Sequence, residues 1–215
     1  MIIAINGLSG IDNIREVSRL GVQWIGLDFE GNSVRRIHQR PALSGIMPDT
    51  PQLKPTEMPQ ETTLMGIFHD EMPQNIITHI YNFHLDVVLL NGGENTVLID
   101  NLRRTVIPDI RREVMFIKTI RVQRHEDIIR AQLFEGHADY LLYDMTDAPW
   151  AWLTENEVKI PFLISGGLTE KDARKMRDFH HPLHVGFCLG KEMESEVGHI
   201  DVERVRLLLN TLSYR

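Results

Sequence analysis

Residues 161–168 read Pro-Phe-Leu-Ile-Ser-Gly-Gly-Leu, a short apolar run that stops at two glycines. A segment whose apolar residues recur at intervals of three and four follows at 170–179, and this is the period of a helix with one buried stripe. An apolar run of this length without polar alternation is typical of a strand that is buried on both faces. The stretch therefore predicts a strand, a turn and a helix of a parallel sheet.

The same unit repeats along the chain. Further segments with helical period lie at 11–20, 74–83, 95–104, 126–134 and 202–212. They alternate with eight apolar runs, at 2–6, 22–29, 64–68, 87–90, 114–120, 138–144, 160–165 and 183–189. This order predicts an α/β protein, a single (β/α)8 TIM barrel of eight parallel strands, although about 250 residues is more typical of that fold. The alternative is an open doubly wound sheet, which usually carries GxGxxG or a P-loop after its first strand, and Gly7-Leu8-Ser9-Gly10 is neither.

One domain over residues 1–215 is expected, because no linker or low-complexity tract divides the chain. The segment 40–63 interrupts the alternation of strand and helix patterns, since it holds five of the ten prolines and its apolar residues show no period. It predicts a loop that leads into the third strand.

Composition excludes several classes of partner. Thirty acidic residues against 23 Lys plus Arg give a formal charge of −7, so no global positive field attracts nucleic acid. The single cysteine, Cys188, forms no internal disulfide, and residues 1–10 lack the features of a signal peptide, which predicts a cytoplasmic protein. No apolar run approaches the roughly 18 to 20 residues of a membrane helix. The ten histidines contain no HExxH or similar ligand pair, so we expect neither a metal nor another cofactor.

Glycines follow the last two predicted strands, and in a barrel the active site lies at the carboxyl ends of the strands. Gly166 and Gly167 follow the seventh run, and Gly190 and Lys191 follow the eighth. Small residues at these ends let backbone N–H groups approach an anion, so the two loops predict a phosphate site. The alternative interpretation of Gly166 and Gly167 is a tight turn that needs positive φ.

Three charged residues stand at or near strand ends. Asp144 ends the sixth run and is a candidate general acid, or otherwise a helix cap or salt-bridge partner. Lys118 lies within the fifth run and is a candidate substrate ligand that needs a carboxylate or phosphate partner, unless it reaches solvent. Arg35 follows the second run, where its guanidinium suits a carboxylate ligand, although exposed arginines are common.

These motifs occur together in one known family. That family opens with K-(V/I)-C-G, then a strand ending G-hydrophobic-(I/V)-F, then S-P-R. The matching residues are Ala4-Ile5-Asn6-Gly7, Gly21-Val-Gln-Trp-Ile-Gly-Leu-Asp-Phe29 and Ser33-Val34-Arg35. Later motifs match at 65–71, 86–92, 117–119, 142–144, 165–168 and 197–201. The whole chain thus resembles phosphoribosylanthranilate isomerase, a β/α barrel of tryptophan biosynthesis.

The resemblance implies an Amadori rearrangement of phosphoribosylanthranilate into an open-chain aminoketone. This reaction needs an acid that protonates the furanose ring oxygen and a base that removes the C2′ proton. In the family these are the aspartate after the sixth strand, matched by Asp144, and the cysteine of the first motif. Asn6 replaces that cysteine, and an amide is not basic near neutral pH. The implied partner is a phosphorylated sugar-anthranilate, bound by a monomer or homodimer.

Other catalytic motifs also depart from the family pattern. The lysine before the cysteine is Ala4, the Gln and His of Q-L-H-G are Leu89 and Asn91, and the glycine-rich loop after the acid is missing. Cys188 replaces an aspartate of the eighth strand and is interpreted as a core thiol.

Three functions follow from these departures. The first is an aldose-ketose type isomerase of impaired activity, in which Asp28, His69 or Asp144 serves as the base. The second is an inactive barrel that binds a phosphorylated metabolite or a partner enzyme of the pathway. The third is a barrel with a changed sugar-phosphate substrate, since fold does not fix function.

Overall fold

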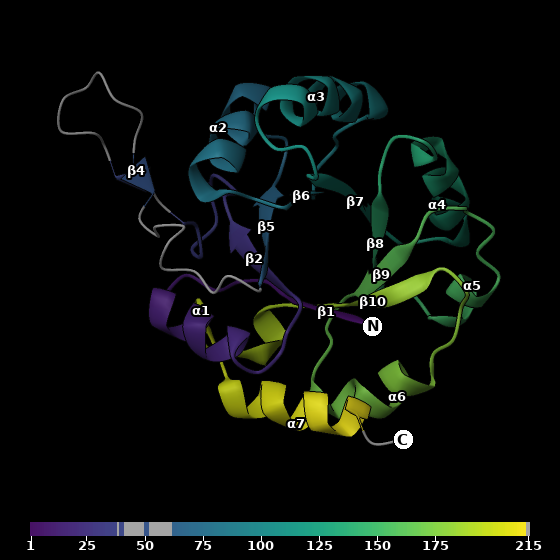
Figure 1. Ribbon diagram of the computed structural model, residues 1–215. Helices are drawn as coiled ribbons and strands as arrows, with labels where there is room; N and C mark the ends of the chain where they lie inside the picture. Colours follow the sequence, from purple (N-terminus) through teal and green to yellow (C-terminus); the bar gives the residue numbers. More distant parts are fainter. Residues whose placement is uncertain (38, 41–49, 52–61, 214–215) are drawn as a thin grey trace.

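Eight parallel strands close into a barrel in the computed structural model, which describes residues 1–37, 39–40, 50–51 and 62–213 (Figure 1). The strands are β1 (Ile2–Ile5), β2 (Trp24–Asp28), β5 (Thr63–Phe68), β6 (Val87–Leu90), β7 (Met115–Arg121), β8 (Tyr140–Asp144), β9 (Phe162–Ser165) and β10 (His184–Leu189). Their order around the ring is β1-β10-β9-β8-β7-β6-β5-β2, and β2 pairs with β1 to close it. The predicted (β/α)8 barrel is confirmed, and the open sheet is excluded.

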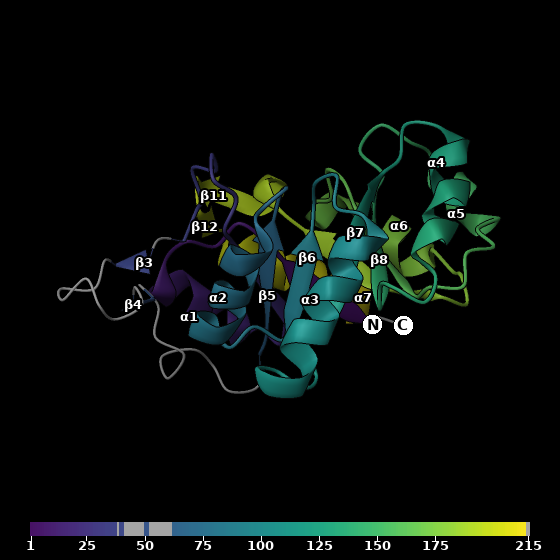
Figure 2. The same cartoon turned by 90° about the horizontal axis from the view of Figure 1, so that it is seen from above.

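Helices surround the ring (Figures 1 and 2). They are α1 (Ile11–Ser18), α2 (Pro73–Phe83), α3 (Thr96–Asp109), α4 (His125–Arg130), α5 (Ala151–Thr154), α6 (Ala173–Asp178) and α7 (Val202–Ser213). No helix in the described ranges is both long and apolar enough to span a bilayer. Most of the predicted loop at 40–63 lies outside the described residues; β3 (Gln39–Arg40) and β4 (Thr50–Pro51) form a separate antiparallel pair.

Apolar side chains pack on both sides of the ring, which explains why the strands show no polar alternation. The interior cluster consists of Ala4, Trp24, Met65, Ile67, Val87, Leu89, Ile117, Leu142, Leu163 and Cys188. A larger cluster fills the space between the strands and the helices. Polar residues that continue the inward-facing series of a strand therefore reach the mouth of the barrel.

Two features of the topology determine how the mouth is built. Strands β2 and β8 lie opposite one another, because β1, β10 and β9 separate them on one side and β5, β6 and β7 on the other. After β10, a short turn of 3-10 helix, η4 (Lys191–Met193), leads into the hairpin β11 (Glu194–Glu196) and β12 (His199–Ile200). Asn13 of α1 ties this hairpin down: its amide donates to Ile200 O at 2.9 Å and accepts from Ile200 N at 2.8 Å.

Candidate active site

A cavity of about 490 Å³ opens among the residues that end or follow the strands. Seven of the eight predicted site residues line it: Asn6, Arg35, Asp144, Gly166, Gly167, Gly190 and Lys191. They come from β1, β8, β9, β10 and the loop after β2, so closure of the barrel brings together residues that are far apart in sequence. Their chemical roles stay predictions.

Asp144 ends β8 and keeps 21% of its side chain exposed toward the cavity that it lines. Its Oδ1 accepts hydrogen bonds from Thr146 N at 3.1 Å and from the Thr146 hydroxyl at 2.6 Å. Arg121 Nε lies 3.6 Å from Oδ2. Asp144 therefore makes the salt bridge of the alternative interpretation and also lines the cavity.

Asn6 directly follows β1 and packs its side-chain amide against β2. Its backbone N–H donates to Leu189 O at 2.9 Å, which extends the pairing of β1 and β10 by one residue. A Cβ atom at Gly26 would overlap Asn6 Oδ1. Gly26 thus makes room for residue 6 at the floor of the cavity.

Cys188 reaches the same floor from β10. It is 4% exposed and belongs to the interior cluster, as expected for a core thiol, but it also lines the cavity. Burial raises the pKa of the Cys188 thiol to about 12, and the interaction with Asn6 opposes this only in part. The thiol is therefore protonated near neutral pH and cannot serve there as a base.

Arg35 is held by a carboxylate of β11. Its Nε and Nη2 donate to the two carboxylate oxygens of Glu194, the latter at 2.7 Å. The hydrogen bond with Glu194 raises the pKa of Arg35, while desolvation opposes it. Gly7, at φ +93°, lies against this pair, and a Cβ there would come 2.9 Å from Glu194 Oε1.

The predicted phosphate corner contains a tight turn. Gly166 and Gly167 have φ of +111° and +65°, and a Cβ at Gly166 would collide with Thr146 N. The positive-φ turn that was the alternative interpretation is therefore present. Within the described ranges, the N–H groups of both glycines donate to no other protein group, so they remain available to an anion.

Lys118 is the predicted site residue that the structure places away from the cavity. Its neighbour Ile117 belongs to the interior cluster, so strand alternation turns Lys118 to the outer face of the ring. Its ammonium donates to Glu94 Oε2 at 2.8 Å, Gly92 O at 2.5 Å and Leu90 O at 3.2 Å. These three acceptors match its three donors, and Glu94 is the carboxylate partner that burial requires.

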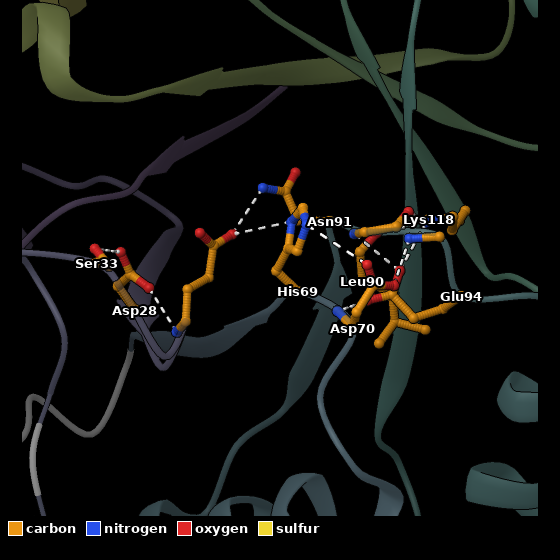
Figure 3. A network of polar contacts seen from close by, with 11 residues as sticks. Asp28, Ser33, His69, Asp70, Leu90, Asn91, Glu94 and Lys118 are labelled. Carbon is orange, nitrogen blue, oxygen red and sulfur yellow. Dashed lines mark hydrogen bonds and ion pairs between the residues drawn. The ribbon is translucent and has the colours of Figure 1, made fainter.

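Polar contacts run from β2 to the outer face of β7 (Figure 3). Glu30 Oε1 accepts from Asn91 Nδ2 at 2.9 Å and lies 3.9 Å from His69 Nδ1. His69 Nε2 lies 3.6 Å from Asp70 Oδ2, and Asp70 N donates to Glu94 Oε1 at 2.8 Å. His69 does not line the cavity, whereas Glu30 and Asn91 do.

Sequence reasoning placed Thr119 only within the strand-end segment 118–121, without a role, and missed Thr146. Thr119 faces the cavity from β7, and strand alternation from Ile117 would have found it. Thr146 bonds Asp144 from the following turn, a contact that no spacing rule indicates. In the described part of the chain, the buried atoms Thr119 Oγ1 and Asn6 Oδ1 have no hydrogen-bond partner, as expected where a ligand or water binds.

Sequence comparison finds relatives over the whole chain, although no family model matches it. The N-(5′-phosphoribosyl)anthranilate isomerase of Parabacteroides distasonis is 28% identical over 215 residues, covering 96% of this chain and 90% of the relative. That of Phocaeicola vulgatus is 25% identical over 224 residues, covering 100% and 99%.

Solved structures agree on the fold. Phosphoribosylanthranilate isomerase from Thermotoga maritima superposes with a TM-score of 0.77 at 18% identity, covering 99% of this chain and 98% of that one. A phosphoribosylanthranilate isomerase complex with reduced 1-(o-carboxyphenylamino)-1-deoxyribulose 5-phosphate gives 0.76 at 18%, with the same coverage. The chain is thus similar over its full length to curated phosphoribosylanthranilate isomerases at 25–28% identity, and its barrel has the fold of their solved structures.

Proposed function

We propose that this protein is an isomerase that rearranges N-(5′-phosphoribosyl)anthranilate, more slowly than relatives with a cysteine at the position of Asn6. One observation carries the proposal: Asp144, Arg35 and the Gly166-Gly167 turn line a single cavity at the strand ends. These are the groups that an acid step, a carboxylate and a phosphate require. Full-length relatives with this named activity support the choice of substrate.

Asp144 supplies the acid half of the reaction. The protonated carboxyl gives its proton to the furanose ring oxygen, and the bond between that oxygen and C1′ breaks. The lone pair of the anthranilate nitrogen forms the C1′=N bond, so no external reactant is needed. Thr146, which donates to Oδ1 from its hydroxyl and its N–H, fixes the carboxyl group at the edge of the cavity.

Arg35 and the glycine turn hold the two ends of the substrate. Glu194 occupies two of the five N–H donors of Arg35, and the other three can bind the anthranilate carboxylate. The free N–H groups of Gly166 and Gly167 can bind the phosphate, and Lys191 adds a positive charge in the same lining.

The base half is weak because Asn6 cannot accept the C2′ proton, and the Cys188 thiol, with its pKa raised by burial to about 12, is protonated. Loss of a general base costs about 10²- to 10⁴-fold in rate. The same substitution favours a second candidate function, in which the barrel binds a phosphorylated ligand without converting it.

Asn6→Cys is expected to raise kcat for phosphoribosylanthranilate about 10-fold or more, because a thiolate at this position can remove the proton. The gain is partial, since Ala4 and the missing glycine-rich loop also depart from the family pattern. Loss of substrate fluorescence on purified protein measures it. Asn6→Ala, which opens the same space without a base, is the control and should show no gain. Absence of consumption by both wild type and Asn6→Cys would contradict an isomerase and leave the binding function.

Glu192→Gln is expected to lower KM about 3- to 10-fold with kcat unchanged. Five acidic side chains and three basic ones line the cavity, so the net negative charge of the lining repels a substrate that carries both a phosphate and a carboxylate. Glu192 lies beside the phosphate corner, with its Oε2 3.7 Å from where a Cβ of Gly190 would be. Removing one charge at a few ångströms is worth about 1 kcal/mol in water. Added salt should reduce the difference in KM between the wild type and Glu192→Gln, because it screens this repulsion. Glu196→Gln, on the exposed part of β11, is the matched control; equal KM values for the two variants would refute the expectation.

A further inference from the structure

Asp28 is an acidic residue of the cavity that the binding and acid steps above leave unused. Trp24, Gly26 and Asp28 share one face of β2 by strand alternation, and Trp24 belongs to the interior cluster. Asp28 therefore continues the inward-facing series to the mouth, where it lines the cavity. The Asn6 amide packs on Gly26, and Asp28 is the next residue along β2 that points to the same face.

The topology places Asp28 opposite the proposed acid. It ends β2 and Asp144 ends β8, and three strands separate β2 from β8 in either direction around the ring. Figure 1 shows the two strands on opposite sides of the barrel. A sugar in the cavity thus has a carboxylate on each of two opposite sides.

The hydrogen bonds of Asp28 leave part of its carboxylate open to the cavity. Its Oδ1 accepts from Glu30 N at 2.9 Å, and its Oδ2 accepts from the Ser33 hydroxyl (Figure 3). Each carboxylate oxygen can accept two hydrogen bonds, so one position on each oxygen stays open. Among the described residues no cation lies within ion-pair distance of Asp28, which is only 9% exposed; its charge nevertheless acts on Arg35, whose pKa it helps to raise after the larger effect of Glu194.

The other candidate bases fit less well. Cys188 has its pKa raised to about 12 by burial. His69 is 53% exposed, lies between the carboxylates of Glu30 and Asp70, and does not line the cavity. Asp144 already serves as the acid.

We propose that Asp28 is the general base that removes the C2′ proton, in place of the cysteine that Asn6 replaces. This inference rests on the proposed isomerase function. The Asp28 carboxylate takes the proton, the C2′–H electron pair forms a C1′=C2′ bond, and the C1′=N electrons move to nitrogen. The resulting enol loses its hydroxyl proton as C1′ gains one, which gives the aminoketone. Asp28 then releases its proton, so no oxidant or reductant is required.

Asp28→Asn tests the proposal, because it removes the base and preserves the shape of the loop. The amide oxygen still accepts from Glu30 N, and the amide nitrogen can donate to the Ser33 hydroxyl. We expect kcat for phosphoribosylanthranilate to fall about 10²- to 10⁴-fold, with KM changed less than about 3-fold. Asp12→Asn, the same exchange at a 92% exposed side chain of α1, should leave kcat unchanged.

Two further variants separate a base from a loop organiser. Ser33→Ala removes the hydroxyl contact and retains the carboxylate, so kcat should fall less than about 10-fold. The double variant Asp28→Asn with Asn6→Cys should regain at least about 10-fold of the lost rate, because the thiol returns a base to the cavity. If Asp28 only organised its loop, a thiol after β1 would not restore the rate.

The outcomes discriminate between the inference and the proposed function. Normal turnover by Asp28→Asn, or an equal loss in Ser33→Ala, would overturn the role of Asp28 and leave the isomerase function intact. Turnover by Asn6→Cys with none by wild type would show that the native chain lacks a base, which overturns the role of Asp28. Absence of turnover by both would overturn the isomerase function and, with it, this inference.

Discussion

Replacement of Asp144 by alanine is expected to lower kcat/KM for phosphoribosylanthranilate by about 10²- to 10⁴-fold, the usual contribution of a positioned general acid. Its carboxyl group is the one that Thr146 and Arg121 hold at the edge of the cavity. Without a proton donor the ring oxygen leaves poorly, so the loss should fall on kcat. The rate at which substrate fluorescence is lost at saturating substrate concentration measures kcat directly.

Two controls accompany this variant. Asp178→Asn changes a 68% exposed carboxylate on α6 and should leave kcat within about 2-fold. Thr146→Val removes the hydroxyl that donates to Asp144 and should reduce kcat by less than the loss of the acid itself. Robust turnover by Asp144→Ala would show that another group protonates the ring oxygen.

A Glu94→Gln substitution is expected to lower the free energy of unfolding by about 3–5 kcal/mol, the usual cost of removing one partner from a buried ion pair. The side chains of Glu94 and Lys118 are 1% and 5% exposed. Glu94 Oε2 accepts from both Lys118 Nζ and Gly92 N, and an amide nitrogen cannot accept from either. Whichever way the amide is turned, at least one of these donors or Asp70 N loses its acceptor, and the Lys118 ammonium stays buried without an opposite charge.

Urea unfolding followed by circular dichroism measures this loss. The matched exchange Glu203→Gln breaks an ion pair with Arg206 on α7 whose side chains are 76% and 50% exposed, and should cost less than about 1 kcal/mol. The double variant Glu94→Gln with Lys118→Met should recover part of the stability, because it no longer buries an unpaired charge. Equal stabilities of Glu94→Gln and Glu203→Gln would contradict this account.

The barrel was predictable because each strand has a recognisable local sequence pattern. Each run is short and apolar without polar alternation, and most are followed by a segment of helical period, so strands and helices could be placed without knowledge of distant residues. Their order around the ring then follows from the handedness of the crossovers. The positive-φ turn at Gly166 and Gly167 was also among the alternatives considered from sequence.

The side-chain partners were less predictable, because they depend on which face a residue occupies. Lys118 was expected among the substrate ligands, but alternation from Ile117 directs it outward to Glu94. From the sequence, Asp28 was a strand-end residue and one of three candidate replacement bases. Its place opposite Asp144 follows from the predicted barrel, but its contacts with Glu30 N and the Ser33 hydroxyl arise in the loop after β2, where no local pattern indicates them.

The pair of Arg35 and Glu194 joins residues 159 positions apart, and the contact of Asn13 with Ile200 spans 187. During synthesis from the amino terminus, the guanidinium therefore emerges from the ribosome long before its carboxylate. A nascent chain that ends before β10 also leaves β1 and β9 without their shared neighbour, and such open strand edges invite aggregation. Barrel closure and the clamp on Arg35 thus both wait for the segment from β10 to β11, so a chain that stops before β10 exposes unpaired strand edges and lacks the carboxylate that holds Arg35.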